Sequence, residues 1–254
     1  MAQESTNLEK ACDLLLMLSQ EDEALPVTEI SRRLDISRTT AYAMLSSLSS
    51  RGFVERGADG RYTIGFSLLR VADGYMRMYP FLPKVEPYVF ELAQLQGQGA
   101  MLAVYKSPCY LLRIVAAAVP NHVPETSLSA LMHPLQCAAG RLLMAQLPPE
   151  QLHNDLLTGP SEMLLPPVKY DPAEQEEKLS ALRGAQYVIE RGVFYPGLGS
   201  LAAPVYNRQG KIIAALSVPL FLTQLTPEEE AHKITEVTAA ALRISGALGY
   251  PVAL

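Results

Sequence analysis

The sequence predicts an α+β protein that begins with a winged helix-turn-helix and continues into a larger domain with one curved antiparallel sheet. Three observations predict this fold class. Two short helical patterns flank a turn within residues 27–51, a basic hairpin pattern follows over residues 53–64, and helical patterns alternate with paired strand patterns beyond it. With 254 residues, 49% of them hydrophobic, the chain can bury a core in each of two domains.

The first expected helix covers residues 7–20. Apolar residues that recur three and four positions apart lie on one side of a helix, so they predict the side that packs inward. That inner row should consist of Leu8, Ala11, Cys12, Leu15 and Leu18.

A helix-turn-helix is predicted from two further apolar rows and the interruption between them. Val27, Ile30 and Leu34 recur at helical spacing, so the first of the two helices should bury one side. Ser37 suits the N-cap of the second helix, because its hydroxyl can accept a backbone N–H that the helix leaves unpaired. This second helix should run over residues 38–51 and bury Ala41, Met44, Leu45 and Leu48.

The outer side of the second helix and the hairpin after it carry the residues expected to contact DNA. Gly52 fits a helix end, and strands over residues 53–56 and 61–64 with a Gly57–Gly60 turn predict a wing. Short hydroxyl side chains and arginine suit phosphates and base edges. The alternative is a small α+β core with solvated arginines. The expected DNA contacts are Arg32, Ser37, Arg38, Thr39, Thr40, Tyr42, Arg56 and Arg61.

The charge distribution favours DNA contact by this segment although the whole chain has a net charge of −5. Residues 32–70 contain seven arginines and three acidic residues, a balance of +4, whereas residues 1–31 contain one lysine and seven acidic residues. Positive charge is therefore concentrated where phosphate would lie. The overall negative charge should limit non-specific binding of nucleic acid.

The sequence does not indicate a membrane protein, a disulfide-stabilised protein or a metalloprotein. No apolar run approaches the roughly 20 residues of a membrane span, and the acidic, polar N-terminus has no signal-peptide pattern. Three widely spaced cysteines, Cys12, Cys109 and Cys137, favour a reducing cytoplasm. The four histidines have no metal-ligand spacing and no Gly-rich phosphate loop occurs, so we expect neither a metal nor a cofactor.

The domain boundary is expected near residue 80. A helix over residues 66–79 should end at Pro80 and Pro83, because proline stops a helix. The expected parts are a winged helix-turn-helix at residues 1–65, a linker helix at 66–80 and a larger domain at 81–254. The apolar residues of the linker helix could pair with a second copy of the chain or pack on their own domain, and the sequence leaves both open.

The larger domain alternates helices and strands. Thr226 should cap the last helix, and Glu228–Glu230 complement its dipole. Residues 129–135 are loop-like. Helices are expected over residues 84–96, 136–147, 149–157, 172–182 and 227–248, and strands over residues 100–106, 110–116, 187–191, 199–206 and 211–220.

These parts, in this order, resemble the IclR family of bacterial transcriptional regulators over nearly the whole chain. Residues 34–45 (LDISRTTAYAML) are similar to its recognition helix, and residues 61–65 (RYTIG) to the end of its wing. In the larger domain, residues 134–145 (PLQCAAGRLLMA), 197–205 (GLGSLAAPV) and 210–218 (GKIIAALSV) are similar to its helix and paired-strand motifs.

The resemblance implies a regulator of transcription. The larger domain would be a GAF-like effector-binding domain for a small organic acid or an aromatic metabolite. The partners would be a palindromic operator in double-stranded DNA and further copies of the chain, as a homodimer or a dimer of dimers. The resemblance also implies an effector pocket, formed by Met101, Met132, Cys137, Ala138, Ala139, Glu190, Ser200, Leu201, Ser217 and Pro219.

Within that implied pocket, the backbone N–H groups of Ala138 and Ala139 would hold a carboxylate at a helix N-terminus. Ser200 and Ser217 would offer hydroxyls on neighbouring strands. Glu190 could instead be a solvated acid at a strand end, and the sequence leaves this alternative open.

Several positions depart from the family pattern. Ala43 stands where relatives commonly have arginine, so base contacts must depend on the neighbouring residues of the helix. In the larger domain Pro219 replaces a small polar residue, and the family's acidic pair appears as Gly192-Val193. Further apolar side chains could line the pocket, namely Leu112, Phe194 and Tyr195. We therefore expect an aromatic or otherwise hydrophobic carboxylate as the effector.

The alternative function is an enzyme that acts on a small carboxylate or ester and uses the N-terminal domain only for recruitment. Cys137 and His133, four residues apart, could be a nucleophile and a base. No acidic residue stands at a recognisable spacing to orient the histidine, so we expect no catalytic residue and no enzymatic activity.

Overall fold

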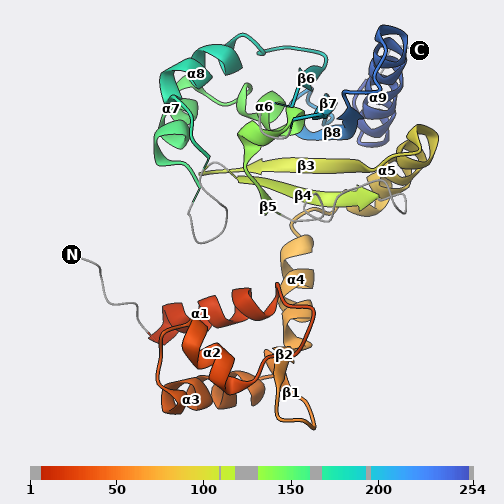
Figure 1. Ribbon diagram of the computed structural model, residues 1–254. Coiled ribbons are helices and arrows are strands. Elements are labelled where there is room, and N and C mark those ends of the chain that lie inside the picture. The colour runs from red at the N-terminus through yellow and green to blue at the C-terminus, as the bar shows by residue number, and fades with distance from the viewer. Residues whose placement is uncertain (1–6, 109, 118–130, 161–167, 193–195, 252–254) are drawn as a thin grey trace. The chain divides into compact units, whose positions relative to one another are not determined.

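The computed structural model describes residues 7–108, 110–117, 131–160, 168–192 and 196–251. The chain divides into two compact units, residues 1–80 and 81–254 (Figure 1). Among the described residues, no helix has both the length and the apolar character that crossing a membrane requires.

The first unit is a helix-turn-helix followed by a two-stranded wing. Its elements are α1 (Asn7–Leu18), α2 (Val27–Arg33), α3 (Arg38–Ser49), β1 (Val54–Arg56), β2 (Tyr62–Ile64) and α4 (Ser67–Met76). Strands β1 and β2 pair antiparallel, with Val54 opposite Ile64. One core joins the helices to the wing, and its buried side chains are Leu14, Leu18, Leu25, Ile30, Leu45, Val54 and Tyr62.

The predicted inner row of α1 is partly wrong. Leu14 and Leu18 are the buried residues of this helix, whereas Leu8 is 75% exposed and Cys12 is exposed. Only the C-terminal half of α1 lies against the core, so the apolar spacing in its first turn does not correspond to burial. Helix α4 has no buried residue, although its sequence is amphipathic.

The second unit contains a six-stranded antiparallel sheet in the order β5-β4-β3-β8-β7-β6. Helices α6, α7 and α8 gather on one side of this sheet and α5 and α9 lie together on the other (Figure 1). The strands are β3 (Ala100–Lys106), β4 (Tyr110–Ala117), β5 (Leu131–Met132), β6 (Val188–Glu190), β7 (Leu198–Tyr206) and β8 (Ile212–Phe221). The helices are α5 (Leu82–Gln96), α6 (Ala138–Met144), α7 (Pro149–Thr158), α8 (Pro172–Ser180) and α9 (Pro227–Ala247).

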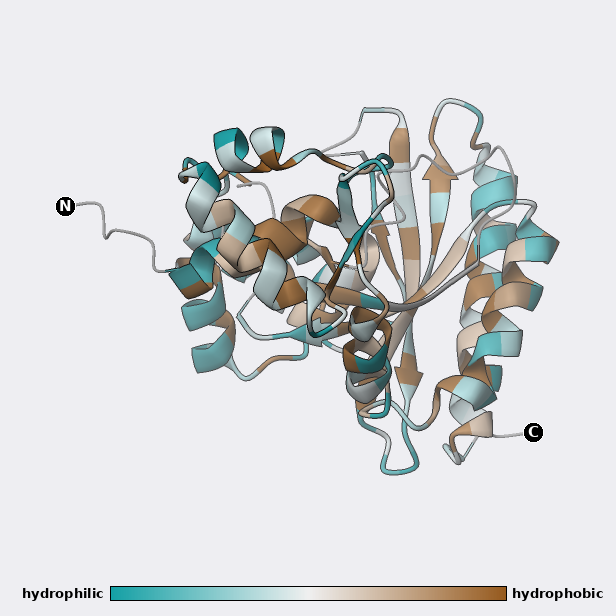
Figure 2. Cartoon of the chain, turned by 90° about the horizontal axis from the view of Figure 1, so that it is seen from below, coloured by the Kyte–Doolittle hydropathy of each residue, from teal (hydrophilic) through white to brown (hydrophobic). Residues whose placement is uncertain are grey.

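Hydrophobic residues follow the strands, and α9 carries hydrophilic residues on the side away from the sheet (Figure 2). The predicted cap of α9 is confirmed: the Thr226 hydroxyl accepts the Glu229 N–H at 3.2 Å, and the Glu229 carboxylate accepts the Thr226 N–H at 2.9 Å. The α+β prediction is confirmed.

Two local predictions differ from the structure. The expected loop before α6 contains strand β5 and a 3-10 helix, Pro134–Gln136. Helix α6 begins at Ala138 rather than at residue 136, because Cys137 is extended, with φ −147° and ψ 160°. Close packing also fixes this start: a Cβ on Gly140 would lie 2.1 Å from the Pro134 carbonyl oxygen.

His133 holds the turn that leads into α6. Its side chain is 1% exposed, and its Nδ1 accepts the Leu135 N–H at 3.2 Å. The ring lies edge-on to Tyr170, with 5.7 Å between the ring centroids. Burial disfavours the charged imidazolium, which lowers the pKa of His133 from 6.5 to about 4.

This burial predicts a loss of stability in acid. The unfolded chain binds a proton at His133 below pH 6.5, while the folded chain resists it until about pH 4. Burial of the neutral ring therefore contributes fully to stability above pH 6.5. Up to about 3 kcal/mol of the free energy of unfolding is lost as the pH falls from 6.5 to about 4. Replacing His133 with Asn keeps a side-chain acceptor for the Leu135 N–H but removes the titration.

Urea unfolding of the full chain between pH 7.5 and pH 4.5, followed by circular dichroism, measures this difference. The free energy of unfolding of His133→Asn should fall less over that range than the wild-type value. An equal fall in both proteins would show that another group causes the acid sensitivity.

Candidate DNA interface and effector pocket

Helix α3 presents one side to solvent because the other side is fixed in the core. Ala41, Met44 and Leu45 are buried, at three- and four-residue spacing. The opposite side exposes Arg38, Thr39, Tyr42, Ala43, Ser46 and Ser47, with Tyr42 49% exposed. Short polar side chains and one aromatic residue therefore line the outer surface of this helix.

Ser37 caps α3, which confirms the sequence-based assignment. The Ser37 hydroxyl oxygen accepts the Thr40 N–H at 3.0 Å and lies 2.8 Å from the Thr40 hydroxyl. Both hydroxyls are thus engaged with each other at the helix N-terminus. Within the described part of the chain, the side chain of Arg38 forms no ion pair and no hydrogen bond.

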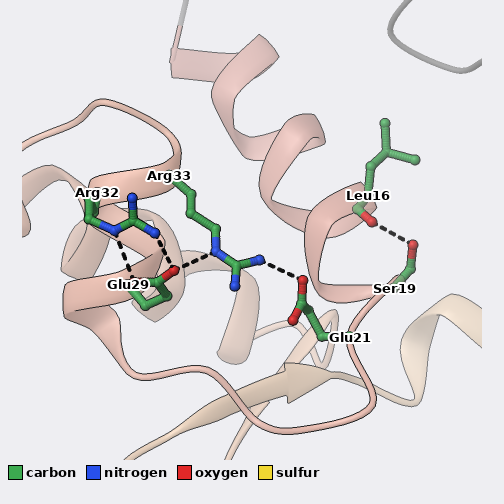
Figure 3. A network of polar contacts seen from close by, with 6 residues as sticks. All are labelled: Leu16, Ser19, Glu21, Glu29, Arg32 and Arg33. Atoms are coloured by element: carbon green, nitrogen blue, oxygen red, sulfur yellow. Dashed lines mark hydrogen bonds and ion pairs between the residues drawn. The ribbon is translucent and has the colours of Figure 1, made fainter. Parts of the chain in front are cut away.

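Arg32 lies in a network that balances its charge (Figure 3). Its Nη2 lies 2.6 Å from one Glu29 oxygen, and its Nε donates to the other at 3.1 Å. Arg33 also contacts Glu29, at 2.6 Å, and reaches Glu21 at 2.6 Å. Hydrogen bonds from the two arginines lower the pKa of Glu29 to about 2. In this structure Arg32 is therefore paired with a carboxylate.

The side chains of both wing arginines contact other residues of the first unit. The Arg56 guanidinium lies 5.7 Å from the centre of the Tyr62 ring, a cation–π contact. Arg61 Nη1 donates to the Ala24 carbonyl at 3.2 Å, and its Nε lies 3.6 Å from Asp59. Both arginines stay at the surface, as a wing that contacts a phosphate backbone requires.

In the second unit, Ser200 joins the sheet to the start of α6. Its hydroxyl oxygen accepts the Ala138 N–H at 2.8 Å. In the sheet register, Ser200 is opposite Pro219, and Ser217 is opposite both Ala202 and Met101. Residues opposite one another share a face. Met101, Ser200, Ser217 and Pro219 therefore lie together on the side of the sheet that α6 covers.

The two serines differ in what they can offer a ligand. Ser217 is 1% exposed and donates its proton to the Leu201 carbonyl at 2.9 Å. In its hydrogen bond with Ala138, the Ser200 hydroxyl is the acceptor, so its proton can still be donated to another group. A ligand on this face would meet a donor at Ser200 and an acceptor at Ser217.

Cys137 and Glu190 lie beside the same helix start. Burial raises the pKa of the Cys137 thiol to about 11, so this sulfur is a neutral thiol at neutral pH. Glu190 is opposite Ser200 and only 5% exposed, so the alternative of a solvated strand-end acid is wrong. His133, the other half of the supposed nucleophile pair, uses its Nδ1 as an acceptor for a backbone N–H.

Two expected pocket residues, Leu201 and Leu112, lie on the other face of the sheet. Leu201 follows Ser200 in β7 and therefore points to the other face, and Leu112, opposite Val104, lies between the inward-facing Leu111 and Arg113. Met132 is opposite Leu111 and packs, like Met101, on the cluster that contains Cys137, Ala138 and Ala139. Phe194 and Tyr195 lie outside the described residues.

Sequence reasoning missed Arg113, a half-buried cation in β4. Arg113 is opposite Ala103, whose side chain belongs to the cluster that packs on α6. Desolvation lowers the pKa of its guanidinium. The signal in the sequence is a single arginine inside an otherwise apolar strand, YLLRIVAA.

A surface groove of about 320 Å³ lies on the other side of the sheet, away from Ser200. The end of α5, the end of β8 and the start of α9 form its walls. Its polar groups largely contact one another: Lys233 Nζ donates to Gln96 Oε1 at 2.7 Å, and His232 Nε2 lies 3.2 Å from Glu236.

Comparison with known proteins relates both units to one family. The family model described as the IclR helix-turn-helix domain matches residues 7–58, and that of the bacterial transcriptional regulator IclR C-terminal domain matches residues 79–246. The glycerol operon regulatory protein of Streptomyces griseus is 28% identical, over 98% of this chain and 98% of its own. The HTH-type transcriptional regulator XynR of Escherichia coli is 25% identical, over 96% and 98%.

Solved structures have the same fold. The IclR protein of Thermotoga maritima aligns with a TM-score of 0.75 and 21% identity, over 96% of this chain and 98% of that one. An IclR homolog of Microbacterium hydrocarbonoxydans, complexed with 4-hydroxybenzoate, aligns with a TM-score of 0.76 and 23% identity, over 96% and 99%.

The cap at Ser37 generates a test that separates stability from DNA contact. Ser37→Ala removes the acceptor for the Thr40 N–H and should lower the stability of the first unit by about 1 kcal/mol. Ser37→Asn and Ser37→Asp both retain an N-cap, so each should unfold close to the wild type.

Fluorescence anisotropy with duplex DNA then compares the two capped variants. Ser37→Asp places a carboxylate where phosphate is expected and should bind DNA at least tenfold more weakly than Ser37→Asn. Equal affinities would place the N-terminus of α3 away from the DNA backbone.

Proposed function

The chain belongs to the IclR family of bacterial transcriptional regulators, and we propose that it binds operator DNA through α3 and the wing under control of a small organic acid. The observation that carries the first half is the outer side of α3. Arg38, Thr39 and Tyr42 are exposed on it while the other side is buried, so this helix can enter a major groove without unpacking its core. Arg56 and Arg61 would contact phosphate from the wing.

We propose that the chain acts as a homodimer, or a dimer of dimers, on a palindromic site. Helix α4 supports this, because it has no buried residue, Leu69 is 74% and Val71 56% exposed, and its N-cap Phe66 is 62% exposed. An apolar surface of this kind marks an interface with another chain. Two recognition helices would then contact half-sites separated by about one turn of DNA. A role on operator DNA further implies a cytoplasmic location.

The effector is proposed to be an aromatic or otherwise hydrophobic carboxylate. Ser200 can donate a proton, and the apolar Met101 and Pro219 lie on the same side of the sheet as the neutral Cys137 thiol. The complex of the Microbacterium hydrocarbonoxydans homolog with 4-hydroxybenzoate supports this class. An effector that binds one arrangement of the dimer better than another would shift its population and change the spacing of the recognition helices.

Arg38 should read a base. Arg38→Ala should reduce affinity for duplexes selected by the protein from a random library by about 1–3 kcal/mol, since a bidentate contact to guanine is lost. Arg38→Lys keeps the charge but not the fork of donors, so it should keep the salt dependence and lose sequence preference. Gel-shift titrations at several salt concentrations measure both. Wild-type affinity and preference in the two variants would contradict the assigned recognition helix.

Ser200 should act on the effector response and not on operator binding. Ser200→Ala removes a donor to the ligand and leaves the Ala138 N–H without its partner, at about 1 kcal/mol of stability. Ser245→Ala is a matched control, because buried Ser245 accepts the Tyr206 N–H at 2.9 Å on the α9 side of the sheet.

Anisotropy with operator DNA, with and without benzoate or 4-hydroxybenzoate, compares the two serine variants. Only Ser200→Ala should lose sensitivity to the acid. Loss of operator binding by Ser200→Ala in the absence of acid, with Ser245→Ala unaffected, would exclude the pocket role.

A further inference from the structure

We propose that Glu29 of α2 weakens the attraction of Arg32 and Arg33 for DNA phosphate and so limits binding of the first unit to DNA of any sequence. This inference rests on the proposed function, because it concerns the same DNA interface. It gives an acidic residue a role there, whereas the contacts expected from the sequence are arginines, hydroxyl residues and one tyrosine.

The two arginines lie at the end of α2, next to the recognition helix. Helix α2 ends at Arg33, and α3 begins at Arg38 after a short turn. In a helix-turn-helix, the first helix crosses the phosphate backbone while N-terminal residues of the second helix contact bases. The side chain of Arg32 is 71% exposed and that of Arg33 is 35% exposed. We therefore expect both guanidinium groups to approach phosphate when α3 lies in a groove.

Glu29 is the carboxylate that the two arginines share (Figure 3). One of its oxygens accepts Arg32 Nη2 and Arg33 Nε, each at 2.6 Å, and the other accepts Arg32 Nε at 3.1 Å. Arg33 Nη1 also donates to Glu21 at 2.6 Å. The Glu29 side chain is 28% exposed, so the Arg32 guanidinium is the outer member of their pair.

These contacts lower the charge that the first unit offers to DNA. Residues 32–70 have a balance of +4, in which Arg32 and Arg33 are two of the positive charges. The structure brings Glu21 and Glu29 onto them from the acidic segment before residue 32, and subtracting these two carboxylates leaves +2. Hydrogen bonds from the arginines lower the pKa of Glu29 to about 2, so its negative charge persists at neutral pH.

A neutralised arginine pair reduces the part of the DNA affinity that does not depend on sequence. Arg32 can offer its Nη1 group to a phosphate, but the Glu29 carboxylate beside it repels that phosphate. Fewer counterions are then released from the DNA, and this release drives non-specific binding. Base contacts by α3 do not involve Glu29, so they supply a larger share of the total affinity. Because non-specific sites greatly outnumber operators in a genome, this keeps more of the protein free to find its operator.

The test is fluorescence anisotropy of the full-length protein with a duplex of unrelated sequence, from about 50 to about 200 mM salt. Glu29→Gln removes the charge and keeps the size of the side chain, and it should fold because surface ion pairs contribute little to stability. It should bind this duplex about threefold more tightly than the wild type at the lowest salt concentration. Its plot of log affinity against log salt should be steeper by about 0.9, the change expected for one more neutralised phosphate.

A matched control separates this local effect from a change in net charge. Glu174 of α8, in the second unit, pairs with Lys178 at 2.6 Å and four residues apart, as Glu29 does with Arg33. Glu174→Gln therefore makes the same change in charge and breaks a similar pair, but it should bind DNA like the wild type. An equal gain in affinity for Glu174→Gln and Glu29→Gln would overturn the proposal.

A double-mutant cycle tests whether the effect acts through Arg32. Arg32→Met should weaken binding to the unrelated duplex more in the Glu29→Gln protein than in the wild type, because only there is the guanidinium without its carboxylate. Equal losses in the two backgrounds would contradict this coupling.

The remaining outcomes are also decisive. Unchanged binding by Glu29→Gln would overturn the inference, and weaker binding would overturn it by showing that Glu29 positions Arg32 for phosphate. If Glu29→Gln is unfolded by circular dichroism, Glu21→Gln and Arg33→Met replace the first two variants, with the same expectations. A wild type that binds neither the unrelated duplex nor duplexes selected from a random library would instead refute the proposed function itself.

Discussion

The outward presentation of α3 depends on one constraint, the burial of Ala41, Met44 and Leu45 in the core of the first unit. A helix fixed on one side by its core has one side left for a partner, and here that side carries Arg38, Thr39 and Tyr42. Ser37 completes the arrangement because its cap defines where the helix starts. Packing of one side of α3 against the core therefore determines which side of the helix is exposed. The residues on that exposed side are the ones available for DNA.

In the second unit, the sheet separates two environments. One face packs on α5 and α9, while the other meets α6 and carries Ser200, Ser217 and Met101. The hydrogen bond from Ala138 to Ser200 ties the start of α6 to this second face. The polar groups described on this face are few, among them Ser200, Ser217 and Glu190. A mostly apolar lining with a small number of oriented polar groups is typical of small-molecule sites, which is why we propose the effector site on this face.

The sequence predicted features that depend on local chemistry. The caps at Ser37 and Thr226 and the paired strands of the wing follow from side chains that bond their own backbone. Features that depend on tertiary packing were predicted poorly: Leu14 is buried where Leu8 was expected, strand β5 lies in an expected loop, and Leu201 points away from the α6 side of the sheet. A sequence motif identifies which residues lie in a strand, but it does not show to which face of the sheet each side chain points. The register of the strands determines that direction. Arg113 was missed for the same reason, because only the register shows which face it shares.

The central claim is that the outer side of α3 contacts operator DNA, and Tyr42 reports on it directly. Tyr42 is 49% exposed, and Tyr187 in the second unit, 42% exposed, is a reference of the same type. Hydroxyl-radical oxidation of side chains, read by mass spectrometry, compares the full-length protein with and without saturating operator DNA. The account predicts that DNA slows the oxidation of Tyr42 several-fold and leaves that of Tyr187 unchanged. Oxidation of Tyr42 at the same rate in free and DNA-bound protein would contradict it.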